Sequence, residues 1–234
     1  MQSKVIGIIG GIAPPSTIDY YQRIIAGFQE KESTHHYPLI LINSIDMTRM
    51  LNLVAKKEFN ALVDYLNGEI QKLKNGGADF AVLASNTPHI VFEQLKKKSN
   101  IPLISIVEKT VKYAKTLGCR KLGLFGTKLT MQGGFYQDGF SKEGIEIVTP
   151  PFESQNYIHD KYMNEFVKGV FLEETKKAFI DIVHHMIKQN NIEGLILGGT
   201  ELPSLLKEDD FNNFRLFNTT KIHVDSILEY AIQN

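Results

Sequence analysis

Two stretches decide the fold of this chain: GADFAVLASNT at residues 77–87 and IEGLILGGTE at residues 192–201. Each contains an apolar run as long as a buried strand, and each run ends in small and polar residues that are typical of a turn. Ser85 and Gly199 hold equivalent places in the two turns, since 85 plus 114 is 199. The pattern indicates a duplicated unit.

A second pair of stretches supports the duplication, because KVIGIIG at residues 4–10 resembles KLGLFG at residues 121–126. Strand-like runs alternate with segments of helical spacing almost throughout the chain. This alternation predicts parallel sheets with helices on their faces. We expect an α/β protein of two similar parallel-sheet halves, related by a pseudo-twofold axis with a cleft between them. The first half is expected at residues 1–105, completed by 210–234, and the second at 106–209.

The segment after the first strand has a clear local pattern. Residues 10–15, GGIAPP, are expected to form a loop. Ser16 or Thr17 is then in position to cap a helix that begins at Ile18.

The composition excludes several classes of protein. The 234 residues contain 26 basic and 26 acidic side chains, so the broad positive field that nucleic-acid binding uses is absent. No apolar run reaches the roughly 20 residues that span a bilayer. The start, MQSKV, leads straight into a strand pattern, and we therefore expect a cytoplasmic protein without a nucleic-acid or membrane partner. The single cysteine, Cys119, excludes an intrachain disulfide and a cysteine-rich zinc site.

Ligands of parallel α/β proteins bind beyond the carboxyl ends of the strands. Asn86 and Thr87 follow such a strand where a helix should begin, and Pro88 suits the first turn of that helix. Free N–H groups there could hold a carboxylate. The alternative is that these polar residues only cap the helix. Turns of this kind are expected at residues 10–17, 85–89, 126–130 and 198–201.

His89 is a further candidate, because it lies four residues after Ser85. It could assist proton transfer, or it could form a hydrogen bond that fixes the turn. The glycines at 7, 10 and 11 have the spacing G-x-x-G-G, which does not fit the dinucleotide-binding fingerprint.

Taken together, GGIAPPST at residues 10–17, ASNTPH at 84–89 and LGGTELP at 197–203 resemble the aspartate/glutamate racemase family, and the resemblance covers essentially the whole chain. It implies a homodimeric isomerase of amino-acid metabolism that works without a cofactor such as pyridoxal phosphate. In the family, one thiolate removes the proton from the α-carbon, and a thiol on the opposite face returns one.

This sequence departs from the family at both thiol positions, which hold Ser85 and Gly199. A serine hydroxyl is a far weaker acid than a thiol and needs a neighbouring base, and glycine has no side chain. Three alternatives follow. The protein is a one-sided isomerase that uses Ser85 with His89 or water, with Gly199 leaving room for a larger substituent. It is a racemase with other bases, such as Glu201. Or it is an inactive relative that binds a small carboxylate and acts in regulation.

The resemblance also implies which residues hold the ligand. Lys168 is similar to a lysine that the family uses against the side-chain carboxylate of aspartate, and Arg49 is its expected companion. A pair of cations would favour a dicarboxylate. The alternative for Lys168 is an exposed lysine at a helix end. The remaining substrate-binding candidates are Thr17, Asn86, Thr87, Thr127 and Thr200.

Overall fold

The computed structural model describes residues 3–31 and 36–232. Met1 and Gln2, which contributed to the expectation of a cytoplasmic protein, lie outside this range, as do the last two residues of the expected first half. The chain forms two compact units. The first comprises the residues up to Ile106 and those from His223 onward, and the second comprises Val107–Ile222.

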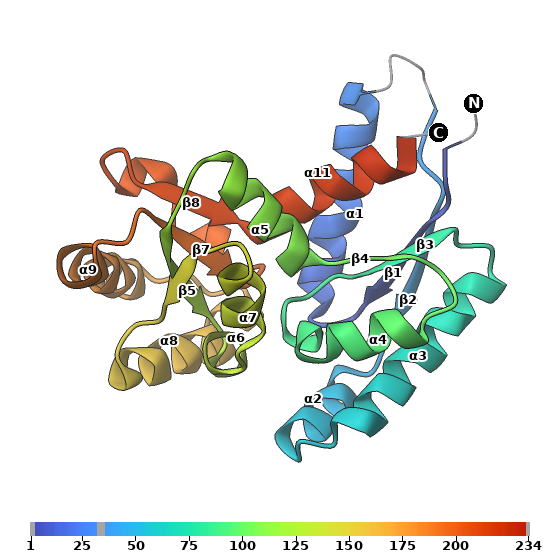
Figure 1. Cartoon of the computed structure of the whole chain (residues 1–234), viewed down its shortest axis with the longest axis horizontal. Helices are drawn as coiled ribbons and strands as arrows, with labels where there is room; N and C mark the ends of the chain where they lie inside the picture. Colours follow the sequence, from blue (N-terminus) through green and yellow to red (C-terminus); the bar gives the residue numbers. More distant parts are fainter. Residues whose placement is uncertain (1–2, 32–35, 233–234) are drawn as a thin grey trace. The chain divides into compact units, whose positions relative to one another are not determined.

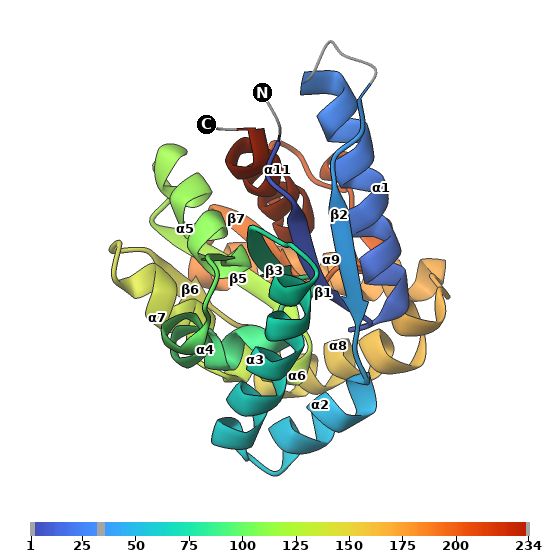
Figure 2. The same cartoon turned by 90° about the vertical axis from the view of Figure 1, so that its right-hand side faces the viewer.

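The first unit contains a parallel four-stranded sheet in the order β2-β1-β3-β4. Its apolar β-branched runs form the strands, as the sequence predicts. Figure 2 shows β2 at the edge of this sheet. The strands are β1 (Ile6–Gly10), β2 (Ile40–Ser44), β3 (Phe80–Leu83) and β4 (Leu103–Ile104), and the helical segments between them are α1 (Pro14–Lys31), α2 (Met47–Ala55), α3 (Phe59–Asn75), the 3-10 helix η1 (Thr87–Val91) and α4 (Phe92–Lys98).

Helices cover both faces of this sheet (Figure 1). Alternate residues of a strand point to opposite faces. Ile9 and Leu83 accordingly pack with apolar residues of α3 and α4, whereas Ile8 and Val82 pack with α1 and with the C-terminal helix α11 (Thr219–Ile232). The helix at the end of the chain is therefore part of the core of the first unit.

The second unit contains a sheet of the same order, β6-β5-β7-β8, also parallel throughout. Phe125 and Leu197 pack on one face with apolar residues of α8 and α9. The strands are β5 (Lys121–Gly126), β6 (Glu146–Val148), β7 (Gly194–Gly198) and β8 (Arg215–Asn218), and the helical segments are α5 (Ile106–Thr116), α6 (Lys128–Gln132), α7 (Phe135–Ser141), α8 (Phe152–Asn164), η2 (Phe166–Lys168), α9 (Glu173–Asn190), α10 (Leu202–Leu205) and η3 (Glu208–Asp210).

The equal strand order matches the duplication read from the sequence, with β1 corresponding to β5 and β3 to β7. The boundary expected after residue 209 is in the wrong place. β8 pairs in parallel with β7, so the second unit continues to Ile222 before the chain returns to the first unit.

A second correction concerns the start of α1. The sequence suggested a loop through Pro15, but the helix begins at Pro14. Proline needs no N–H partner in the first turn of a helix, and its fixed φ suits that turn. Among the described residues, no helix combines the length and apolarity needed to cross a membrane.

Candidate active site

The loop after β1 is closed by a threonine. The hydroxyl of Thr17 accepts a hydrogen bond from the backbone N–H of Gly11 at 2.8 Å. A Cβ at Gly10 would lie 2.5 Å from the Thr17 side chain, so this position accepts only glycine. Thr17 is buried, and its predicted contact with a ligand would have to coexist with this structural role.

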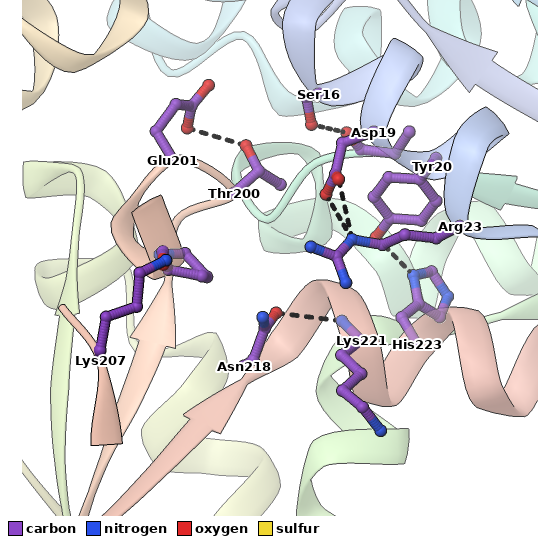
Figure 3. A network of polar contacts seen from close by, with 12 residues as sticks. Ser16, Asp19, Tyr20, Arg23, Thr200, Glu201, Lys207, Asn218, Lys221 and His223 are labelled. Atoms are coloured by element: carbon purple, nitrogen blue, oxygen red, sulfur yellow. Dashed lines mark hydrogen bonds and ion pairs between the residues drawn. The ribbon is translucent and has the colours of Figure 1, made fainter. Parts of the chain in front are cut away.

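The turn after β3 is tied to the same edge of the sheet. Ala84 donates its N–H to the carbonyl of Ile9 at 3.0 Å, and the hydroxyl of Ser16 donates to the carbonyl of Ala84 at 2.9 Å (Figure 3). These bonds place Ser85 beside the loop of Thr17 at the carboxyl end of the sheet. Ser85 is buried, and its hydroxyl forms no hydrogen bond with any other residue in the described part of the chain.

His89 holds this turn through main-chain contacts. Its Nδ1 bonds the carbonyl oxygen of Ser85 at 2.9 Å, and its Nε2 accepts the N–H of Ile106 at 3.2 Å. A neutral ring protonated on Nδ1 satisfies both bonds. Burial, together with the nearby His223, lowers the pKa of His89 to about 3. The geometry favours the alternative in which His89 fixes the turn, because it faces the backbone of Ser85.

Asn86 and Thr87 follow directly and are also buried. The carbonyl of Asn86 accepts the N–H of His89 at 3.0 Å, and Thr87 begins η1 with Pro88 in the first turn. The sequence thus predicted the helical start after Ser85 correctly.

Arg49 lies on α2, after the carboxyl end of β2, and is exposed. Asp46 caps this helix by accepting the N–H groups of Thr48 and Arg49. The guanidinium of Arg49 lies over the ring of Tyr65, 4.4 Å from its centroid, which is a cation–π contact. A role for Arg49 in binding a carboxylate stays a prediction.

The second unit gathers its own motifs at one edge. Gly126 and Gly198 pair in register at the ends of β5 and β7, so the residues that follow them are neighbours. Thr127 caps α6, since its hydroxyl accepts the N–H of Thr130 at 3.3 Å. Thr200 donates its hydroxyl to Oε2 of Glu201 at 2.8 Å (Figure 3).

Gly199 shows the clearest departure from expectation. The room that the missing side chain was expected to leave for a larger substituent is filled by Tyr162 of α8. A Cβ at position 199 would lie 2.4 Å from Cε2 of Tyr162 and 2.7 Å from its hydroxyl oxygen. Tyr162 in turn donates a hydrogen bond to Oε2 of Glu201.

Sequence reasoning missed Tyr162. The residue precedes Glu201 by 39 positions and lies on a helix whose buried side includes Ile158. An aromatic residue in this pattern predicts only core packing. The Cβ contact at Gly199 is visible only in three dimensions.

Lys168 ends η2 and is exposed, and it forms no ion pair with another described residue.

Asn218 lies at the end of β8. Its side chain accepts the N–H of Lys221 at 3.0 Å and so caps α11 (Figure 3). Cys119 is buried just before the amino end of β5, at the edge of this sheet opposite to Thr127 and Gly199. It is therefore remote from the candidate residues of its own unit.

The two sheets share one strand order, and the motifs lie beyond equivalent strands, at the edge where parallel α/β proteins bind their ligands. A family model described as Asp/Glu/Hydantoin racemase matches residues 9–227. The chain belongs to this family of racemases, which are isomerases.

Solved structures agree with this assignment. A candidate Asp/Glu racemase from Yersinia pestis is 30% identical with a TM-score of 0.90, and the match covers 98% of this chain and 100% of that one. An aspartate racemase homologue from Pyrococcus horikoshii OT3 is 31% identical with a TM-score of 0.86 at the same coverage.

Curated relatives match over shorter stretches. The broad specificity amino-acid racemase RacX of Bacillus subtilis (strain 168) is 28% identical over 62% of this chain and 63% of its own length. The glutamate racemase of Aquifex pyrophilus is 32% identical over 58% of this chain. That match spans only 51% of the Aquifex protein, so the chain covers about half to two thirds of these relatives.

Proposed function

We propose that the protein binds a small amino acid or dicarboxylic acid through the strand-end motifs of its two units, in the expected cleft, and catalyses proton exchange at the α-carbon without pyridoxal phosphate. The observation that supports this most strongly is the presence of equivalent motifs, at Ser85 and Gly199, beyond equivalent strands in a racemase-family chain. The activity differs from two-thiol racemisation because neither position holds sulfur.

Ser85 supports the one-sided form of this activity. Its hydroxyl is left without a hydrogen bond among the described residues, so it is available to a ligand or to a bound water. A single proton-transfer group exchanges the α-proton on one face of the substrate and returns it to the same face. Exchange without inversion is the expected outcome.

An alternative is a protein that binds a carboxylate and has no catalytic activity. The contact between Gly199 and Tyr162 favours it, because the tyrosine fills the place of a second thiol. The chain would then act as a binding or regulatory protein.

Deuterium exchange separates the two functions. The protein is incubated in deuterated water with L- or D-aspartate and with L- or D-glutamate, and the α-proton signal is followed by NMR. Loss of the signal with retained configuration supports the one-sided enzyme, and inversion would show that a second base operates. Ser85→Ala is the matched variant and should slow exchange at least tenfold. Binding by calorimetry without exchange would favour the inactive alternative.

We further expect a cytoplasmic homodimer. Ile18 and Tyr21 of α1 and Ile42 of the edge strand β2 are large apolar residues with 57%, 45% and 43% of their surface exposed. Exposed apolar side chains of this size are a common feature of contact surfaces. Light scattering measures the mass, and a monomeric mass at micromolar concentration would contradict the expectation.

A further inference from the structure

The hydroxyl end of Tyr162 occupies the place of the side chain that Gly199 lacks. A Cβ at position 199 would meet Cε2, the hydroxyl oxygen and Cζ of Tyr162 at 2.4, 2.7 and 2.8 Å. Carbon atoms that are not bonded do not approach so closely, so the two side chains exclude one another. The polar atom beside this strand end therefore comes from α8 and not from residue 199.

The hydroxyl of Tyr162 is not an isolated group. It donates to Oε2 of Glu201, and the hydroxyl of Thr200 donates to the same oxygen at 2.8 Å. Tyr162 and Glu201 are 6% and 8% exposed. Burial first, and then the adjacent Glu201, raise the pKa of Tyr162 well above its usual value. The tyrosine is therefore neutral at physiological pH, with a carboxylate oxygen placed to receive its proton.

We propose that Tyr162 and Glu201 are the proton-transfer pair of the second motif, in the place of a thiol at position 199. This inference rests on the proposed function, since it supposes that a small amino acid binds at this strand end. The single proton-transfer group of the one-sided exchange is then Tyr162, which touches the α-proton, with Glu201 as the acceptor behind it, and the hydroxyl of Ser85 serves to hold the ligand or a bound water.

The step moves two protons. The hydroxyl oxygen of Tyr162 takes the α-proton while its own proton passes to Oε2 of Glu201. The α-carbon–hydrogen bond and the original O–H bond break, and new O–H bonds form at Tyr162 and at Glu201. The electron pair stays on the substrate, delocalised into its carboxylate. Tyrosine is neutral before and after, so no tyrosinate forms beside the buried carboxylate.

The reverse step returns a proton to the same face. Deuterium enters when the protonated Glu201 exchanges with solvent before the return. The relay thus predicts deuterium exchange with retained configuration for one enantiomer, even in a chain without the two thiols.

Tyr162→Phe tests the pair, since phenylalanine keeps the ring beside Gly199 and removes only the hydroxyl. We expect α-proton exchange to fall at least about 100-fold, within the usual range for loss of an acid–base group. Ligand affinity measured by calorimetry should stay within about threefold. Tyr157→Phe, on the same helix, is the matched control and should leave exchange unchanged.

Glu201 is tested by rescue. Glu201→Gln should reduce exchange as strongly as Tyr162→Phe, whereas Glu201→Asp keeps a carboxylate and should recover at least tenfold over the glutamine variant.

The possible failures are distinct. If the unaltered protein exchanges the α-proton and Tyr162→Phe does so within threefold of it, Tyr162 only fills space and the inference is overturned. If the unaltered protein binds aspartate or glutamate without exchange, the inference is overturned and the binding function stands. If it neither binds nor exchanges these amino acids, the proposed function itself fails.

Discussion

The motif after β3 and the motif after β7 follow corresponding strands of two sheets with the same order, yet their central positions are filled in opposite ways. At Ser85 the chain supplies a short side chain and holds its backbone with His89. At Gly199 it supplies no side chain and brings Tyr162 from a neighbouring helix. The comparison shows that equivalent topology does not imply equivalent chemistry, because the atom at a strand end can come from a distant segment.

The largest effect is expected at the first motif. His89→Ala leaves the carbonyl of Ser85 and the N–H of Ile106 without their buried partner and removes the stacking on Phe92. Each buried polar group left unpaired costs about 1–3 kcal/mol. We expect a loss of about 3–5 kcal/mol in the free energy of unfolding, measured with urea. His89→Gln offers both a donor and an acceptor and should lose about half as much. A loss below about 1 kcal/mol in His89→Ala would show that the ring does not hold the turn.

The same residue predicts a pH dependence. The pKa of His89 is about 3 in the folded chain and about 6.5 when unfolded, so the unfolded state binds more protons between these values. This contribution to stability is therefore complete above pH 6.5 and declines as the pH falls towards 3. Between pH 6.5 and 5, the protonation of this histidine in the unfolded state should lower the free energy of unfolding by about 2 kcal/mol.

Urea unfolding at both pH values measures this loss. His89→Gln should remove the contribution, and His185→Ala, which alters an exposed histidine, should retain it. An equal pH dependence in all three proteins would contradict the assignment.

An intermediate effect is expected when a thiol is placed in each motif separately. Gly199→Cys forces the new side chain against Tyr162 and should cost about 1–3 kcal/mol, the usual range for overpacking. Ser85→Cys changes one atom and should cost less than about 1 kcal/mol. This asymmetry follows from the different ways in which the two positions are filled.

A double-mutant cycle sharpens the test. Tyr162→Leu keeps an apolar side chain in the core and removes the hydroxyl and the outer ring atoms. Combined with Gly199→Cys, it should cost less than the sum of the single changes, by at least about 1 kcal/mol. Strict additivity would mean that the tyrosine does not occupy this place. The triple variant with Ser85→Cys is then the proper test for restored racemase activity.

The smallest effect on stability is expected at Lys168. Lys168→Ala removes an exposed side chain and should change the free energy of unfolding by less than about 0.5 kcal/mol. If Lys168 binds the side-chain carboxylate, the affinity for L-aspartate should fall about tenfold, while that for L-alanine stays the same. Calorimetry with Lys112→Ala, another exposed lysine of this unit, is the control. Equal affinities for L-aspartate would remove Lys168 from the site.

Much of the fold could be predicted from the sequence because the strands are nearly continuous apolar runs. Val82 and Leu197 lie in such runs, and small polar residues mark where each strand ends. The start of α1 at Pro14 could not be predicted, since proline suits both a loop and a first helical turn. β8 is short and contains Arg215, so the sequence did not show which sheet it would join.

The strand-end turns of the candidate site could be predicted in position, but the side chains that surround them could not. The turns at Ser85 and Gly199 follow strands, and parallel topology places such turns at the carboxyl edge of each sheet. The sequence offered a hydrogen bond from His89 that fixes the turn, four residues after Ser85, as one alternative. Its contact with Ile106 and the approach of Tyr162 depend on tertiary packing, which leaves no local signal. Sequence reasoning therefore located the strand ends and overlooked the atoms supplied from elsewhere.

The position of α11 also affects how the chain is made. Val224, Ile227 and Leu228 complete the apolar cluster that contains Ile8 and Val82, although more than a hundred residues separate them along the chain. A ribosome releases this helix only after the whole second unit, so the core of the first unit stays incomplete while the second unit is made. Nascent chains stalled near Ile222 should bind chaperones through this uncovered face.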